Sequence, residues 1–261
     1  MARITTRAWN NYIGILRRLS ERASKEMLAT LTKLNAQYEE GAITFEEYQN
    51  AAIEFAYALA TRYGEGAGAM ACEMYDAIAK LQGANVPPAD PAATATMDET
   101  ARAVVGTMKT GNINIVSDAT GRLVKLVGVD TMQQNALRDG AEWAWIPRGD
   151  TCAFCITLAS RGWQRASKRA LRNGHAEHVH ANCDCTYAVR FDDNLDVEGY
   201  EPQDYLDMYY DADGDSPQER INALRRKFYN ENKEIINEQK RSAYAKKIER
   251  ESSAAEELNV D

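Results

Sequence analysis

Four of the five cysteines in the chain fall into two short groups whose spacing is typical of metal ligands. Cys152 and Cys155 are separated by two residues, so a tight turn allows both sulfurs to reach one zinc ion at about 2.3 Å. After 24 further residues come His180, Cys183 and Cys185. One tetrahedral ion bound by both groups would join two distant loops. We therefore expect a structural Zn²⁺ site.

Five candidate ligands compete for about four places around such an ion. Side chains alternate along an extended segment, so Cys183 and Cys185 would point the same way and both could bind. The sequence does not choose between them. The preferred set is Cys152, Cys155, His180 and Cys185, with Cys183 as the nearest alternative. The fifth residue would be spare or would support the ligands.

Free thiols in a reduced core are the alternative to a metal site. The polar, basic start from Met1 to Asn11 lacks the apolar stretch of a secretion signal, so we expect folding in a cytoplasm, where disulfides are rare. Clustered cysteines in such a compartment more often bind metal. Cys72 stands apart in an apolar helical stripe and is expected to be a small core residue.

The zinc site is expected to be structural, because so many ligands leave no place open for a reactive water. The chain contains no recognisable Ser, His and Asp triad, no HExxH motif and no phosphate-binding glycine loop. His175 and Glu177 have the spacing of a nucleoside deaminase motif, but Cys152 and Cys155 precede it, whereas the paired cysteines of those enzymes follow it. We predict no catalytic residues, no organic cofactor and no enzymatic activity.

A zinc-supported, HNH-like nuclease is the main alternative function. In such enzymes a histidine activates water beside a metal, while paired cysteines hold the fold. His178, His180 and Asn182 supply the residue types. His180 is the last histidine of the chain, however, so the downstream metal-binding histidine is missing.

The composition sets further limits. With 261 residues, of which 44% are hydrophobic, the chain can bury a sizeable core. No apolar run approaches the roughly 20 residues needed to cross a bilayer, so no membrane partner is expected. The net charge of −8 argues against a protein whose whole surface binds nucleic acid. Between Arg148 and Arg190, seven basic residues stand against three acidic ones, so this part could face DNA or be a solvated basic surface.

Apolar residues at three- and four-residue intervals predict a helix over 5–38, which Gly41 ends. Thr44 and Glu47 form a capping-box pattern at the start of a second helix, antiparallel to the first. Three glycines, Gly64, Gly66 and Gly68, are expected to interrupt this helix before it resumes and stops at Gly83.

Three prolines mark the segment after Gly83 as a linker or a long surface loop. Thr96 with Glu99, and Asp130 with Gln133, repeat the capping pattern and predict two more helix starts. Alternating residues predict short strands over 142–146 and 186–191. A charged helix is expected from Pro217, after a segment over 192–216 that carries ten acidic residues and no basic ones.

The predicted fold is mainly α, with a helical N-terminal part, a small α+β zinc-binding module and a C-terminal helix. The expected regions are an N-terminal helical region at 1–83, a proline-rich linker at 84–96, the zinc-binding module at 97–192, and an acidic segment with a charged helix at 193–261.

Three segments carry a resemblance to a known family: WIPRGDTCAFC at 145–155, LASRG at 158–162 and HANCDC at 180–185. Together they resemble the MuF-like minor capsid, or head morphogenesis, proteins of tailed bacteriophages, especially the branch labelled VG15. The resemblance covers about residues 130–191. It includes Arg161 and Gly162, and Gly162 is expected to allow a turn.

The resemblance implies a virion protein of low copy number at the portal vertex, acting in procapsid assembly, DNA packaging or genome delivery. Its partners would be portal and capsid proteins, with packaged DNA as a further candidate. It would be made in the host cytoplasm and reside inside the capsid or at the portal vertex. No established catalytic activity comes with the family. The metal-ligand positions carry over to Cys152, Cys155, His180, Cys183 and Cys185.

Overall fold

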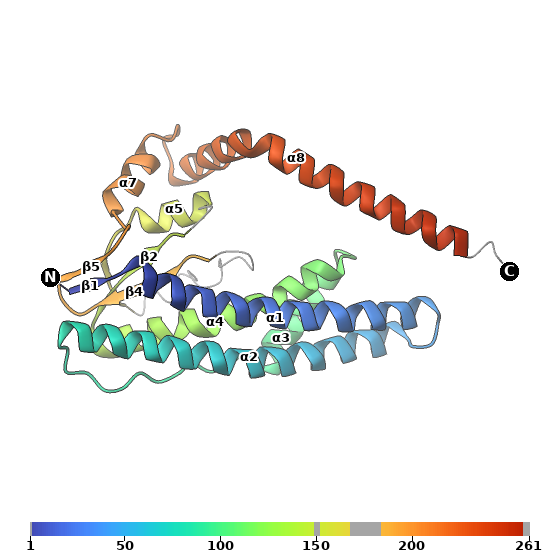
Figure 1. The fold of residues 1–261 in the computed structure, drawn as a ribbon, viewed down its shortest axis with the longest axis horizontal. Coiled ribbons are helices and arrows are strands. Elements are labelled where there is room, and N and C mark those ends of the chain that lie inside the picture. The colour runs from blue at the N-terminus through green and yellow to red at the C-terminus, as the bar shows by residue number, and fades with distance from the viewer. Residues whose placement is uncertain (1, 149–151, 168–183, 258–261) are drawn as a thin grey trace.

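Two long antiparallel helices, α1 (Thr6–Glu39) and α2 (Phe45–Gln82), form a hairpin (Figure 1). The chain turns between them at Gly41, which has a φ of 72°. Thr44 and Glu47 form the predicted capping box, so the expected helix start is confirmed. The computed structural model describes residues 2–148, 152–167 and 184–257.

Helix α2 is continuous, so the interruption predicted at Gly64, Gly66 and Gly68 is wrong. Two of these glycines instead allow other parts of the chain to pack closely against the helix. A Cβ atom at Gly64 would lie 3.0 Å from the side chains of both Thr94 and Val127, and Gly68 has similarly close neighbours. The helix tolerates the low helical propensity of glycine because other parts of the chain pack closely against its surface at these positions.

Helix α4 (Ile113–Asp139) lies against both long helices, and α3 (Met97–Met108) packs beside it. The capping box predicted at Thr96 and Glu99 is present at the start of α3. Most of the buried apolar residues of α1, α2 and α4 belong to one hydrophobic cluster. The helices on both sides of the proline-rich segment therefore share one core.

The proline-rich segment, 84–96, has no regular secondary structure and is fastened to α4 by polar contacts. The Arg138 guanidinium donates to the carbonyl oxygen of Pro87 over 2.9 Å, and the Asn135 side chain accepts from the amide of Asp90 over 2.9 Å. The prolines prevent a helix in this segment, so its backbone groups lack helical hydrogen bonds. The side chains of α4 supply hydrogen bonds to these groups instead. The division of the chain into four regions stays a prediction.

The helix start predicted at Asp130 and Gln133 is wrong, because both residues lie inside α4. A capping pattern marks a helix start only where the preceding chain is not helical, and here a helical apolar run leads directly into it. Asp130 is instead a half-buried carboxyl group. Burial, together with the nearby charge of Glu99, raises its pKa to about 6 from an ordinary value of 3.8.

Asp130→Asn is expected to raise the free energy of unfolding by about 1 to 2 kcal/mol near pH 7.5, and by much less near pH 4. A raised pKa means that the protonated carboxyl stabilises the fold at low pH, and that this contribution is lost as the pH rises through about 6. Urea unfolding at the two pH values measures the difference. An equal change at both would contradict the burial of this carboxyl group.

Gly121 marks a close approach of α4 to α1. A Cβ atom here would press on the Ser24 hydroxyl and lie 2.9 Å from the carbonyl oxygen of Ser20. Gly121→Ala is expected to lower the free energy of unfolding by about 1 to 3 kcal/mol. Gly106 lies in α3, and a Cβ atom there would meet nothing within 4 Å. Gly106→Ala should therefore raise the free energy of unfolding by roughly 0.5 to 1 kcal/mol. Thermal unfolding compares the two variants, and equal stability would argue against this helix contact.

A three-stranded antiparallel sheet lies at the end of the hairpin that carries the N-terminus (Figure 1). Its central strand, β2 (Glu142–Ile146), pairs with β3 (Gln164–Arg165) on one side and with β4 (Thr186–Arg190) on the other. The two predicted strands are confirmed. Trp143 and Trp145 are both buried, and so are Ala144 and Ile146, so both faces of β2 are covered.

A second, two-stranded parallel sheet joins the N-terminus to the chain that follows β4. Here β1 (Ala2–Ile4) pairs with β5 (Leu195–Val197). Each strand has only three residues, which is too short for alternation to predict.

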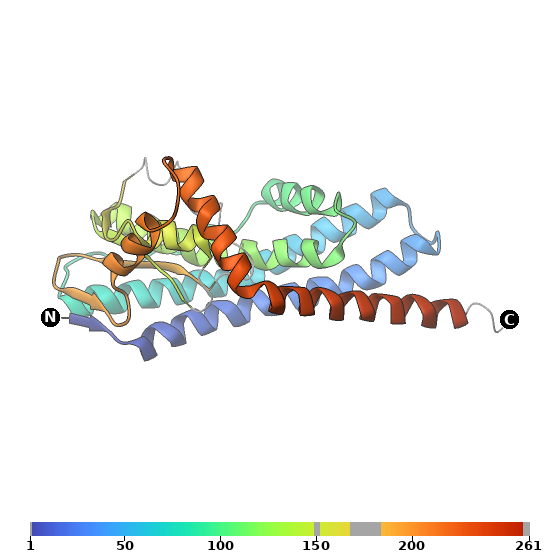
Figure 2. The ribbon, with the colours of Figure 1, turned by 90° about the horizontal axis from the view of Figure 1, so that it is seen from above.

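Three helices complete the described structure: α5 (Ala153–Ala159), α7 (Pro202–Tyr210) and α8 (Pro217–Glu257). The predicted helix from Pro217 is confirmed. Leu224 of α8 packs near Ile156 of α5, and the rest of α8 extends away from the sheet (Figures 1 and 2). The predicted mainly helical class is confirmed. None of the helices in the described part of the chain is long and apolar enough to span a bilayer.

Candidate metal centre

The pairing of β2 with β4 brings the two cysteine segments toward one end of the sheet. Ile146, the last residue of β2, pairs with Thr186, the first residue of β4. Cys185 therefore lies beside the chain that leaves β2 toward Cys152. The amide of Arg148 donates a hydrogen bond to Cys185 Sγ over 3.4 Å. Supporting hydrogen bonds of this kind orient the ligands of metal sites.

Cys152 and Cys155 lie at the start of α5. Cys152 is the residue before the helix, with an extended backbone at φ −75° and ψ 161°, and its side chain makes no capping hydrogen bond. Cys155 lies in the first turn and is 1% exposed. The tight turn predicted for the pair is thus the first turn of a short helix. Both residues contact the main hydrophobic cluster.

The described residues contain three of the five predicted ligands: Cys152, Cys155 and Cys185. His180 and Cys183 lie outside the described residues. None of the three thiols forms a disulfide with another described cysteine. Among the described side chains, no three His, Cys, Asp or Glu residues are grouped closely enough to hold a metal ion. The ligand set therefore stays a prediction.

The donor chemistry of the described residues fits zinc. Cysteine thiolates are preferred ligands of structural zinc. Here they come from the two segments that the sheet places at one end, and one of them, Cys185, accepts an amide hydrogen bond. A zinc ion held by both segments would supply folding free energy by joining the exit of β2 to the entry of β4.

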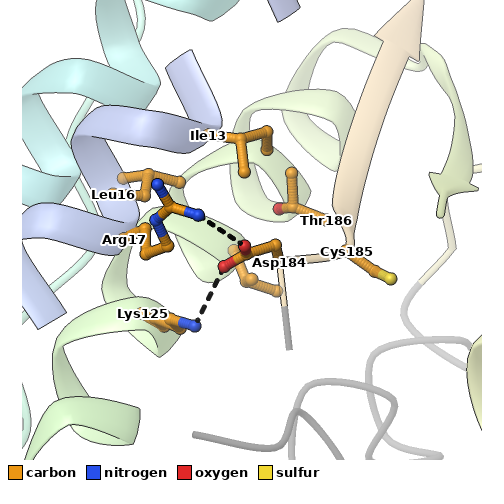
Figure 3. A pocket seen from close by; sticks show the side chains of 8 residues that line it. Ile13, Leu16, Arg17, Lys125, Asp184, Cys185 and Thr186 are labelled. Atoms are coloured by element: carbon orange, nitrogen blue, oxygen red, sulfur yellow. Dashed lines mark ion pairs between the residues drawn. The ribbon is translucent and has the colours of Figure 1, made fainter. Parts of the chain in front are cut away.

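Asp184, which sequence reasoning did not single out, connects the second cysteine segment to the helices (Figure 3). Its carboxylate lies 3.5 Å from Lys125 Nζ of α4 and 3.5 Å from the Arg17 guanidinium of α1. Lys125 is buried, although lysine is seldom found inside a protein. In the sequence, the burial of Lys125 is indicated only by its position inside the apolar run 123–127.

Other contacts stabilise the sheet and the segments that flank α5. The turn expected after α5 is confirmed, since Gly162 has a φ of 62°. Arg190 of β4 bonds to Glu142 over 2.7 Å, and its guanidinium lies 4.8 Å from the centre of the Trp163 ring. The Tyr200 hydroxyl donates to the last carbonyl of α5 over 2.9 Å. Burial raises the pKa of Tyr200 above its ordinary value, so this hydroxyl stays protonated to a higher pH than an exposed tyrosine would.

The residues on which the two enzyme alternatives depend lie outside the described residues: His175, Glu177, His178 and Asn182. The structure therefore tests neither the deaminase nor the nuclease alternative.

The sequence model described as VG15 protein matches residues 3–212 of the chain. This range is wider than the region of about 130–191 that carries the motif resemblance, and it includes both cysteine segments and the three helices α1, α2 and α4. Comparisons with curated proteins and with solved structures gave no match. Because the match spans well over half of its 261 residues, the chain belongs to the VG15 family of phage proteins.

Proposed function

We propose that this protein is a structural minor capsid protein of a tailed bacteriophage, associated with the portal vertex and acting in head morphogenesis, DNA packaging or genome delivery. Its partners are portal and capsid proteins, and it resides inside the capsid or at the portal vertex. The observation that carries the proposal is the family match over residues 3–212, which contains all three motif segments.

The shape of the molecule supports a role in assembly. The α1–α2 hairpin and α8 extend well beyond the sheet and offer long helical surfaces (Figures 1 and 2). At the tip of the hairpin, Tyr38 and Phe45 are 42% and 50% exposed, with their ring centres 5.8 Å apart. Exposed aromatic side chains of this kind are common in protein interfaces.

The zinc ion in this proposal has a structural role. The sheet has three strands, one of them only two residues long, so it provides limited pairing for the segments around it. A metal ion held by Cys152, Cys155, His180 and either Cys185 or Cys183 would compensate by joining these segments.

The chain is proposed to have no enzymatic activity. Incubation with plasmid DNA and a divalent metal should leave the plasmid intact. Cleavage that disappears in His178→Ala or His180→Ala would overturn this part of the proposal in favour of the nuclease alternative.

Contact with packaged DNA is a secondary part of the proposal. Some of the basic residues between positions 148 and 190 already have partners within the fold. Arg190 pairs with Glu142 and Asp193, and Arg148 donates to the carbonyl oxygen of Asn10. Binding of the whole chain to DNA at low salt, weakening as salt increases, would support the role. No binding at low salt would remove it.

Analysis of purified phage particles that encode this chain tests the proposed function. Quantitative mass spectrometry should find the chain in few copies relative to the major capsid protein, and chemical cross-linking should join it to the portal. Particles made without the chain should assemble capsids but package or deliver DNA poorly. Absence of the chain from both procapsids and mature particles would contradict a capsid role.

A further inference from the structure

An ion pair between a buried lysine and a half-buried aspartate anchors the second cysteine segment to the helical part of the molecule (Figure 3). The side chains of Lys125 and Asp184 are 9% and 23% exposed, and their charged atoms lie 3.5 Å apart. The Arg17 side chain is 49% exposed and has a second carboxylate, Glu21, at 3.6 Å. Exposed pairs contribute little, whereas removal of one partner from a buried pair has a large effect. Lys125 is therefore the stronger of the two anchors.

The anchor fixes the direction in which the neighbouring cysteine points. Adjacent side chains of an extended segment lie on opposite sides. The carboxylate of Asp184 points toward α1 and α4, whereas the sulfur of Cys185 points away from them (Figure 3). On that other side the amide of Arg148 contacts the sulfur. The segment cannot rotate about its own axis without losing the ion pair to Lys125.

We infer that Asp184 is a positioning residue for the zinc site: it holds the second cysteine segment against α1 and α4 so that the Cys185 sulfur is presented to the metal. The inference rests on the proposed zinc site and adds a coupling to it. Because one short segment carries both the ligand and the anchor, zinc binding on one side strengthens the attachment to the helices on the other.

Two residues provide matched controls. Thr186 faces the same pocket as Lys125 and Asp184, is 3% exposed, and its hydroxyl has no hydrogen-bond partner among the described residues. Thr186→Val therefore changes the pocket without changing its charge. Asp196 has a side chain 21% exposed and pairs with Arg3 at 2.7 Å in the small parallel sheet. Asp196→Asn removes a comparably exposed, paired carboxylate elsewhere in the fold.

Zinc affinity, measured by competition with a chromophoric chelator, tests the inference on the full chain. Asp184→Asn should weaken zinc binding by about tenfold or more, whereas Thr186→Val and Asp196→Asn should bind as the wild type does. Asp184→Glu should recover part of the loss. The combination of Asp184→Asn with Lys125→Gln should lose less affinity than the two single variants together, because both substitutions break the same pair.

Two further measurements separate positioning from general stability. With cobalt in place of zinc, the thiolate-to-metal absorption should change in Asp184→Asn and remain unchanged in Asp196→Asn. Removing zinc from the wild type should increase hydrogen exchange around Arg17 and Lys125, and this increase should be much smaller in Asp184→Asn.

The outcomes distinguish this inference from the proposed zinc site. If the wild type binds zinc and Asp184→Asn binds it as tightly as Asp196→Asn does, the positioning role is overturned and the zinc site stands. If the wild type binds no zinc, both are overturned.

Discussion

Purified protein should contain about one zinc ion per chain, and Cys152→Ser should reduce this content to nearly none. Serine keeps the size of the side chain but is a poor zinc ligand, so the variant would leave the two segments without their shared ion. The accompanying loss in the free energy of unfolding should be about 5 kcal/mol or more, because the free energy of structural zinc binding contributes to folding. Metal analysis and urea unfolding measure the two effects.

Cys72 provides the matched control for this experiment. Like Cys152 it is half-buried, but it lies on α2 and belongs to neither cysteine segment. The Cys72→Ser variant should have the same zinc content as the wild type. If Cys72→Ser and Cys152→Ser lose equal amounts of zinc, or if neither loses any, the assignment of Cys152 as a ligand is wrong.

Trp145→Ala is expected to lower the free energy of unfolding by about 3 to 5 kcal/mol. Trp145 lies in the central strand, is 2% exposed, and its ring packs edge-on against Tyr187 of β4 with the ring centres 4.8 Å apart. Truncation would leave a large cavity between the sheet and the helices. Chemical denaturation in the presence of zinc measures the loss.

Trp145→Phe separates packing from hydrogen bonding in the same position. The indole N–H of Trp145 is buried and has no hydrogen-bond partner among the described residues. Trp145→Phe therefore reduces the volume of the side chain but removes no hydrogen bond made in the described structure. The free energy of unfolding should fall by roughly 1 to 2 kcal/mol. A loss below about 1 kcal/mol for Trp145→Ala would contradict its central place in the core.

Local signals in the sequence were sufficient for much of the fold. The capping boxes at Thr44 and Thr96 depend on two residues three positions apart, so the pattern predicts them directly. The strands at 142–146 and 186–190 were predictable from the spacing of their large side chains at every second residue. These features depend on neighbours in the chain and require no knowledge of its packing.

One wrong prediction concerns positions where distant contacts determine the structure, and the other concerns a local pattern that lies inside a longer helix. Gly64 does not interrupt α2, because Thr94 and Val127 pack against it in the folded chain. Asp130 fits the capping pattern but lies within α4, since the preceding apolar run is already helical. Propensity is a weak guide where tertiary packing opposes it.

The candidate site also has one part that the sequence predicts and one part that it does not. Spacing within each segment predicts which cysteines would bind zinc, and this ligand set stays a prediction. The ion pair between Asp184 and Lys125 was not predictable, because the two residues are distant in sequence and meet only when β4 docks on α4. A lone lysine in an apolar helical run indicates a buried partner but does not identify it.

X-ray absorption at the zinc edge, on the purified full chain, tests the central claim most directly. One ion held by both cysteine segments predicts a four-coordinate shell dominated by sulfur at about 2.3 Å with one nitrogen at about 2.0 to 2.1 Å. Cys155→Ser, from the first segment, and Cys185→Ser, from the second, should each deplete this shell. A shell of oxygen and nitrogen alone, or a sulfur shell that survives loss of either segment's cysteines, would contradict the claim.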